Sequence, residues 1–444
     1  MKYLCLVFIT ILTLKQTNAQ AISGNLKHHA GQEFTFQGFD YYETKDLATT
    51  VADSLGNFTL HYPKEYKGMA LLKSEDKNSL VLLLSKESLL TIEGTHITET
   101  DSLQFNATEN ATFFNYAMGQ GYRTNALNAW KYLDKLYTME KQFAKQKKVK
   151  KTIQKELQRI NATEQKLVNG LATDSYLRWF IPYRKFIQEM PTIIRTETER
   201  IPATIALFRT TDFNHPNWKT SGVLKDYIES HYFMLENYKS LEENAIEMNL
   251  SSKYLISNLK NNKELLNLVA KELFIYLDER SLFKAAEYLA VELLTNHRKV
   301  LELNVIKRLE KYGSLKIGNK APEIQFAGKK LSDYKQPVLL VFGVSDCSAC
   351  KTEAVEMLKY YDAWKSKNVE VVYISLDTDK TVYEQAYKNA PWQMVNDFKG
   401  WKSEIVKSYA IYGTPTYFLL DAEGKIVSHI NSVGHANAWI MSRL

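Results

Sequence analysis

Residues 337–350 read PVLLVFGVSDCSAC, and this stretch decides the fold of the C-terminal part of the chain. The apolar run 337–344 predicts a buried strand, and 350–364 has the length and the apolar spacing of a helix. A second strand is expected at 369–376, followed by a helix at 381–389. Strands that alternate with helices predict a parallel sheet covered by helices, as in α/β domains.

The end of the chain predicts a hairpin. Residues 416–420 and 425–429 are strand-like runs on either side of the turn 421–424, which reads DAEG. A short helix is expected at 437–443. Because the sequence pattern changes at Ile317, we expect the α/β domain to span 317–444.

Two regions with different patterns precede this domain. Residues 20–106 alternate polar and apolar residues in short runs separated by turns, which predicts an all-β sandwich with antiparallel strands. Residues 107–311 have few prolines and glycines and repeat apolar residues at spacings of three and four, which predicts an all-α domain. Aromatic residues at 179–186 fit a packed helix face, although Pro182 predicts a kink or a break there. The sequence therefore predicts a multidomain chain.

The segment 1–19 has the pattern of a secretory signal peptide. Lys2 precedes a largely apolar run, and Ala19 supplies a small residue for cleavage. A membrane anchor is the alternative, but a span needs about 20 apolar residues and this run ends at Lys15. We expect export across the inner membrane to the periplasm or cell envelope, with no stable transmembrane span in the mature chain.

The charge balance does not indicate a nucleic-acid partner. The formal net charge is +7, and removal of Lys2 and Lys15 with the signal peptide leaves a mild excess of +5. The densest basic stretch, 141–155, interleaves its lysines with other residues at helical spacing. This pattern predicts a solvated helix face rather than a binding patch.

Cysteine usage indicates redox chemistry at the C-x-x-C motif. Of the three cysteines, Cys5 leaves with the signal peptide, so the mature chain keeps only Cys347 and Cys350. A disulfide between residues three apart closes a very short loop and contributes little stability, which favours a chemical role. At a strand-to-helix junction Cys347 caps the helix, whose free N–H groups and dipole favour a thiolate. We therefore expect Cys347 to be the attacking nucleophile and Cys350 to be the resolving thiol.

A zinc site is the structural alternative for this pair. Two cysteines at this spacing form half of such a site, and His429 and His435 could supply the other half. Zinc-binding pairs lie in tight turns between small elements, whereas here a buried strand precedes the pair and a long helix follows. We expect both histidines to be surface residues, and we expect no metal and no cofactor.

Three motifs together resemble one family. Residues 318–322 read GNKAP, 347–353 read CSACKTE, and 413–417 read GTPTY. In these motifs the chain resembles the TlpA/ResA-like periplasmic thiol-disulfide oxidoreductases, which belong to the thioredoxin-like superfamily and are related to AhpC/TSA-Redoxin proteins. Longer members of this family also have a β domain and a helical domain before the thioredoxin-like domain. The resemblance implies disulfide exchange, in the reducing direction, and a role in cytochrome c maturation.

The resemblance also implies roles for three more residues. Pro415 is expected to follow a cis peptide bond and to face the cysteines, while the backbone of Thr414 offers hydrogen bonds to a bound partner segment. Family members that read C-x-x-C-x-x-E use the glutamate to move a proton, a role that falls on Glu353 here. The alternative is that Glu353 is a solvated residue favoured by the helix dipole.

The chain also departs from the family pattern. Val341 occupies the position where many thioredoxins have a buried aspartate, which leaves Glu353 as the candidate proton carrier. Asp346 replaces the usual aromatic residue before the first cysteine, and its charge is expected to raise the pKa of Cys347. Residues 348–349 lack the usual proline, so the redox potential does not follow from the family.

Two other functions are alternatives to disulfide exchange. A thiol peroxidase of the same fold needs an activating Thr or Ser, a proline and an arginine, but positions 344 and 340 are Val and Leu and Arg443 is the only arginine after Arg308. A non-enzymatic binding or scaffold protein of the envelope is the second alternative. For disulfide exchange, the expected partners are envelope proteins with thiols or disulfides, and an upstream thiol protein that donates electrons.

Overall fold

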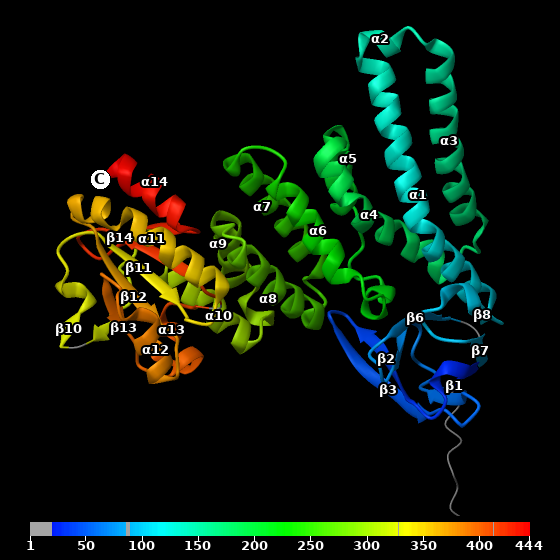
Figure 1. Ribbon diagram of the computed structural model, residues 1–444, viewed down its shortest axis with the longest axis horizontal. Coiled ribbons are helices and arrows are strands. Elements are labelled where there is room, and N and C mark those ends of the chain that lie inside the picture. Colours follow the sequence, from blue (N-terminus) through cyan, green and yellow to red (C-terminus); the bar gives the residue numbers. More distant parts are fainter. Residues whose placement is uncertain (1–19, 86–88, 327, 412) are drawn as a thin grey trace, which may run out of the picture. The chain divides into compact units, whose positions relative to one another are not determined.

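The computed structural model describes residues 20–85, 89–326, 328–411 and 413–444 (Figure 1). The expected signal peptide, 1–19, lies outside the described residues. The described chain forms two compact units. Unit 1 contains the residues up to Arg195 and His215–Ser230, and unit 2 contains Thr196–Asn214 and His231–Leu444. The helices of 107–311 are therefore divided between the units, and the expected domain boundaries stay predictions.

Unit 1 begins with two four-stranded sheets that share one hydrophobic core. Strand β4 shows how the sequence builds this core, because Phe58, Leu60 and Tyr62 are buried while the residues between them are exposed. One sheet has the order β4 (Asn57–Tyr62), β1 (Gln20–Leu26), β7 (Leu89–Gly94), β8 (Gln104–Phe105). The other has the order β3 (Glu43–Val51), β2 (Glu33–Asp40), β5 (Gly68–Ser74), β6 (Ser79–Leu84).

The strands differ from the expected antiparallel arrangement at one pair. β1 and β7 pair in parallel, whereas the other strand pairs described in these two sheets are antiparallel. The parallel pair is possible because five other strands lie between β1 and β7 in the sequence, and no hairpin has to join them. The assignment of the two sheets as a sandwich stays a prediction.

The helices of unit 1 confirm two sequence predictions and contradict part of a third. The basic stretch 141–155 is largely exposed, and Trp179 packs against Tyr183 and Trp218. However, one helix continues through Pro182, so of the predicted kink or break the break does not occur, and the kink stays a prediction; burial of the apolar face of this helix offsets the loss of one backbone hydrogen bond. The helices are α1 (Thr108–Met139), α2 (Lys141–Ala144), α3 (Lys147–Gly170) and α4 (Tyr176–Thr196), and α6 (Leu224–Glu236) crosses from unit 1 into unit 2.

Unit 2 continues with helices that bury their apolar faces. In α8, Leu265, Val269 and Leu273 lie on one side and are buried, as their spacing of four predicts. The helices are α5 (Ile201–Phe208), α7 (Leu241–Leu259), α8 (Lys263–Glu279), α9 (Phe283–Glu292) and α10 (Leu303–Ser314). In the described part of the chain, no helix has the length and hydropathy needed to cross a membrane.

The C-terminal part of unit 2 confirms the predicted α/β domain. Its sheet has the order β13-β12-β11-β14-β15, and β11 pairs in parallel with β12 and antiparallel with β14. All six residues of β11 are buried, as expected for a central strand covered on both faces. The strands are β11 (Val338–Gly343), β12 (Glu370–Ser375), β13 (Gln393–Val395), β14 (Thr416–Leu420) and β15 (Ile426–Ile430).

The helices of this domain lie on both faces of the sheet. Met357 and Trp364 of α11 pack with Ile440 of α14 on one face, and Val406 of α13 packs on the other. The closing helix begins four residues before its predicted start, because the hydroxyl of Ser432 accepts a hydrogen bond from the backbone and caps it. The helices are α11 (Ser348–Ser366), α12 (Lys380–Tyr387), α13 (Glu404–Ser408) and α14 (Val433–Arg443).

Candidate active site

The two cysteines lie where β11 passes into α11, as predicted. Cys347 is the N-cap residue of α11, and its Sγ accepts a hydrogen bond from the backbone N–H of Cys350 at 3.2 Å. Both are free thiols; Cys347 is half-buried and Cys350 is buried. The outer thiol can therefore reach a partner, while the inner thiol is screened from solvent.

The surroundings shift the pKa values of the two thiols in opposite directions. Burial alone would raise the pKa of Cys347, but hydrogen bonds with Cys350 and Thr414 outweigh it, and the pKa lies below its ordinary value. Burial and the neighbouring Cys347 thiol raise the pKa of Cys350 to about 11. Cys347 is thus the readier thiolate, which agrees with its expected role as nucleophile.

Asp346 is an exposed side chain directly before the nucleophile. The strongest influences on the pKa of Cys347 are burial, Cys350 and Thr414, and their net effect is to lower it. Repulsion by the Asp346 carboxylate, which was expected to raise the pKa of Cys347, is therefore not the dominant effect on this pKa. Its smaller contribution stays a prediction.

The loop before β14 lies next to Cys347. The peptide bond between Thr414 and Pro415 is cis, as the family resemblance implies. The carbonyl oxygen of Thr414 lies 3.5 Å from Cys347 Sγ. The two segments meet because β11 and β14 pair antiparallel, with Phe342 opposite Thr416, so the end of one strand lies beside the start of the other.

Glu353 connects three elements. Its Oε2 accepts hydrogen bonds from the hydroxyl of Tyr417 on β14 at 3.0 Å and from the backbone N–H of Val433 at the start of α14 at 2.6 Å. A carboxylate is favoured at the N-terminus of α14 by the helix dipole. Glu353 is therefore half-buried and fixed in place, unlike the solvated residue of the alternative interpretation.

Tyr417 also belongs to the site, although no motif in the sequence marks it as a site residue. It lies opposite Val341 on β14, and Tyr373 lies opposite Val341 on β12, so two phenols flank the position where many thioredoxins have an aspartate. Burial raises the pKa of both tyrosines, and the charges of Glu353 and Cys350 raise that of Tyr417 further. Both phenols stay protonated. The strand pairing across the sheet could not be read from the motif alone.

Asp377 fixes the loop that leads into Cys347 and was also missed. It is buried just after β12, and the backbone N–H of Ser345 donates to both of its carboxylate oxygens at 3.2 Å. The hydroxyls of Ser345 and Ser375 also donate to this carboxylate. Such a buried carboxylate with several donors holds the residues before the nucleophile in one conformation.

A cavity of about 260 Å³ lies beside the Thr414–Pro415 bond. Residues from the junction of α8 and α9 line it, including Asp278 and Phe283, so the helical part of unit 2 takes part in building the site. Burial and the charge of Glu279 raise the pKa of Asp278 to about 7. No sequence pattern predicts this cavity, because its walls come from segments more than a hundred residues apart.

The histidines of the zinc alternative have other roles in the structure. His429 is half-buried, whereas an exposed residue was expected: its Nε2 donates to the carbonyl of Leu315 at 3.0 Å, and its ring packs against Phe283 and Phe418. Burial lowers its pKa. His435 is exposed on α14, as expected. Among the residues that the structure describes, neither cysteine belongs to a group of His, Cys, Asp and Glu side chains close enough to share an ion.

Comparisons with known proteins agree on the C-terminal domain. The model of the AhpC/TSA family matches residues 317–429. The thiol-disulfide oxidoreductase ResA of Bacillus thuringiensis subsp. konkukian is 36% identical over 127 residues, which cover 26% of this chain and 70% of the relative. The sporulation thiol-disulfide oxidoreductase A of Bacillus subtilis is 34% identical over 96 residues, 20% of this chain and 56% of the relative.

Two solved structures are similar to part of this chain. The thioredoxin domain of a thiol-disulfide oxidoreductase from Bacteroides vulgatus is 30% identical and covers 29% of this chain and 98% of that chain, with a TM-score of 0.27. A thioredoxin-like protein from Bacteroides caccae is 15% identical and covers 55% of this chain and 94% of that chain, with a TM-score of 0.39.

Proposed function

Because the chain belongs to the family of ResA-like thiol-disulfide oxidoreductases, we propose that it reduces disulfides of envelope proteins through Cys347 and Cys350. It is an enzyme with a thioredoxin-like domain, which disfavours the alternative function as a non-enzymatic scaffold protein. One observation carries the assignment of the two cysteines. A half-buried helix-capping thiol with a lowered pKa lies beside a buried thiol whose pKa is raised.

The proposed reaction has two exchange steps. The Cys347 thiolate attacks one sulfur of the partner's disulfide, which forms a mixed disulfide and releases the partner's other sulfur as a thiolate. Cys350 then loses its proton and attacks Cys347 Sγ, which frees the partner's second thiolate and leaves a disulfide between Cys347 and Cys350. Two electrons pass to the partner. An upstream dithiol protein would reduce the enzyme again by the reverse sequence.

The second step needs a proton acceptor, because the pKa of Cys350 is raised to about 11. We assign this role to Glu353, with the phenol of Tyr417 between the carboxylate and the sulfur atoms. The hydrogen bond from Tyr417 to Glu353 and the electrostatic influence of both thiols on Tyr417 support this route. A protonated phenol can pass a proton on by giving up its own and accepting another.

The partner segment would bind along the backbone of Thr414 beside Pro415, over the adjacent cavity. The 3.5 Å separation between Thr414 O and Cys347 Sγ supports this, since a segment bonded there brings its disulfide within reach of the thiolate. Asp278 and Phe283 lie on the cavity wall, so the helical part of unit 2 would contact the bound partner and influence which partners bind.

The location and pathway are part of the same proposal. The expected signal peptide, 1–19, would export the chain to the periplasm or cell envelope, where disulfides persist. Cytochrome c maturation is the pathway that the family resemblance suggests.

A dithiol-dependent insulin reduction assay on the full chain tests the activity directly. We expect turnover by the wild-type chain and none by Cys347→Ser, because the attacking thiol is lost. Equal rates for the two chains would refute the assignment of Cys347 as nucleophile.

A further inference from the structure

The cavity beside Pro415 has two walls of different origin. Thr414 and Pro415 belong to the thioredoxin-like domain, whereas Asp278, Glu279 and Phe283 belong to the helices that precede it. The match to the AhpC/TSA family begins only at residue 317, so the helical wall lies outside the matched region. The volume of about 260 Å³ is far above the roughly 15 Å³ that one water molecule needs, so a whole side chain can enter.

The helical wall carries negative charge. Asp278 and Glu279 are the last two residues of α8, and both line the cavity. Among the lining residues that the structure describes there is no lysine or arginine. His429 also lines the cavity, but burial lowers its pKa and leaves it neutral at ordinary pH. The cavity therefore presents two carboxyl groups without a countercharge on its described walls.

This placement of two acidic residues costs stability. The C-terminus of a helix is the negative end of its dipole, which favours cations and disfavours carboxylates. Burial and the charge of Glu279 raise the pKa of Asp278, and the charge of Arg308 on α10 is too weak to compensate. Arg280, the next residue along the chain, pairs with Glu236 instead, at 2.7 Å. Charged groups that are costly to the fold are typical of functional sites.

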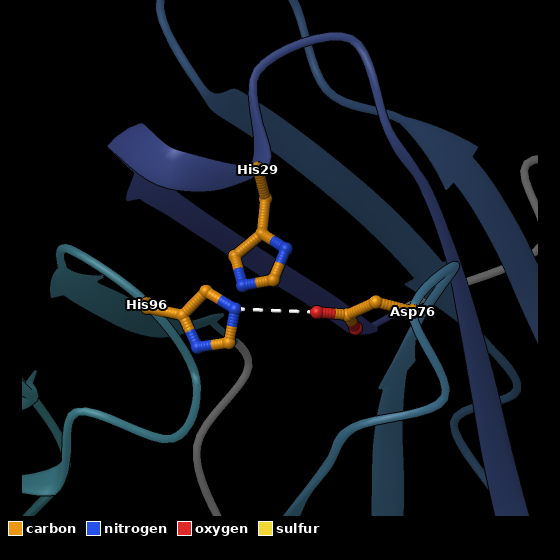
Figure 2. A group of neighbouring side chains, drawn as sticks. All are labelled: His29, Asp76 and His96. Atoms are coloured by element: carbon orange, nitrogen blue, oxygen red, sulfur yellow. Dashed lines mark hydrogen bonds and ion pairs between the residues drawn. The ribbon is translucent and has the colours of Figure 1, made fainter.

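Another group of ionisable side chains, in unit 1, shows the contrast (Figure 2). His29, Asp76 and His96 lie close together, and the two imidazole rings are stacked. The acceptor nitrogen of each ring receives a backbone N–H, from Ile97 and from Thr98, and His96 Nε2 lies 3.3 Å from the Asp76 carboxylate. These side chains are partnered within the chain and have a structural role, whereas the carboxyl groups of the cavity have no such partners in the described structure.

We propose that the cavity binds a lysine or arginine side chain of the partner segment, close in sequence to the cysteine that bonds to Cys347. This inference rests on the proposed function and names the class of segment that the enzyme selects. The carboxylates of Asp278 and Glu279 would pair with the cation. Phe283 and Pro415 offer apolar surface to the stem of the side chain.

The position of the basic residue in the partner segment follows from the site. Thr414 lines the cavity, and its carbonyl oxygen lies 3.5 Å from Cys347 Sγ. One residue of an extended segment spans about 3.3 Å. A side chain that enters the cavity therefore comes from a residue one or two positions from the partner's cysteine.

Reduction of matched disulfide peptides by the full chain tests the proposal. Three peptides have the same intramolecular disulfide and differ only in the residues that flank its cysteines, which are Lys, Gln or Glu. Each rate is divided by the rate at which dithiothreitol reduces the same peptide, because a nearby charge also changes the reactivity of the disulfide itself. We expect the corrected rate at pH 8 to be at least ~10-fold higher for the Lys peptide than for the Glu peptide, with the Gln peptide between them.

The double variant Asp278→Asn and Glu279→Gln removes both charges from the wall. It should reduce the ratio of the Lys rate to the Glu rate to about 2 or less. Glu423→Gln is the matched control, because it removes an exposed carboxylate between β14 and β15 that does not line the cavity. It should keep the wild-type ratio. Equal corrected rates for the three peptides, or a wild-type ratio in the double variant, would overturn the proposal and leave the reductase function in place.

Reduction of none of the peptides would count against the reductase function, not against the cavity. Binding of the same peptides to Cys347→Ser, measured by fluorescence anisotropy, then decides the question. Tighter binding of the Lys peptide that is lost when Asp278→Asn and Glu279→Gln are added supports the proposal. Equal binding of the three peptides overturns it.

Discussion

Glu353 holds α11 against β14 and α14, and it is also the candidate proton acceptor for Cys350. These two roles can be separated, because Gln keeps an oxygen that accepts hydrogen bonds from Tyr417 and Val433 but takes up no proton at ordinary pH. We expect Glu353→Gln to keep the fold and to slow the resolving step at least ~10-fold. Stopped-flow measurement of mixed-disulfide decay from pH 5 to 9 checks this. An unchanged rate profile would leave Glu353 with its structural role only.

The charge of Asp346 is expected to affect the pKa of Cys347, and this effect can be tested by removing that one charge. Its carboxylate directly precedes Cys347 and is exposed, so solvent weakens its repulsion of the thiolate. We expect Asp346→Asn to lower the pKa of Cys347 further below its ordinary value. The rate of alkylation by iodoacetamide as a function of pH reports this pKa. A pKa that stays the same or rises would show that the carboxylate has no influence on the thiolate.

The sequence predicted that Cys347 and Cys350 lie at the junction of a strand and a helix, and the family resemblance implied that Pro415 lies beside them, because these residues belong to short motifs. It did not predict Tyr417 or Asp377 as site residues. Their roles depend on strand register and on the spatial neighbours of Ser345, which no motif records. His429 was expected at the surface because a single histidine in a strand has no pattern that shows it is covered by Phe283.

At the level of elements, Asp377 connects the end of β12 to the loop that enters α11. Asp377→Ala removes the acceptor for the N–H of Ser345 and for two hydroxyls, so we expect a loss of about 2 kcal/mol in stability and slower disulfide exchange. Asp379→Ala is the control, because it removes only the cap of α12, worth about 1 kcal/mol. Chemical denaturation and insulin reduction measure both effects. Full activity of Asp377→Ala would contradict the positioning role.

The junction of α8 and α9 should make stability depend on pH. The pKa of Asp278 is about 7 in the folded chain, against an ordinary value of 3.8 when the chain is unfolded, so the folded chain binds more protons between these values. Stability therefore falls as the pH rises from about 4 to about 7. Asp278→Asn should reduce this fall and stabilise the chain on the order of 2 kcal/mol at pH 8.

Urea denaturation at pH 5 and pH 8 measures this effect. Glu279→Gln is the control at the same junction, and because Glu279 is exposed its effect should be smaller. If Asp278→Asn and the wild type lose the same stability between the two pH values, Asp278 is not the group responsible.

For the whole molecule, the family resemblance inferred from three motifs is confirmed for residues 317–429. The α/β order of the C-terminal domain followed from alternating strand and helix patterns, which are local. Three features of the structure did not follow from local sequence patterns. They are the parallel pairing of β1 with β7, the division of the helices between two units, and the cavity beside Pro415. Each depends on contacts between distant segments, for which a single sequence holds no signal.

In the proposed reaction, Cys347 forms a mixed disulfide that Cys350 resolves. Cys350→Ser, expressed in its own envelope and analysed on non-reducing gels, tests it most directly because the partner then stays covalently attached. We expect adducts that disappear with reductant, and few or none for Cys347→Ser, which lacks the attacking thiol. Mass spectrometry of the adducts identifies the partners. If Cys347→Ser traps as many partners as Cys350→Ser, or if neither variant traps any, the proposed mechanism is contradicted.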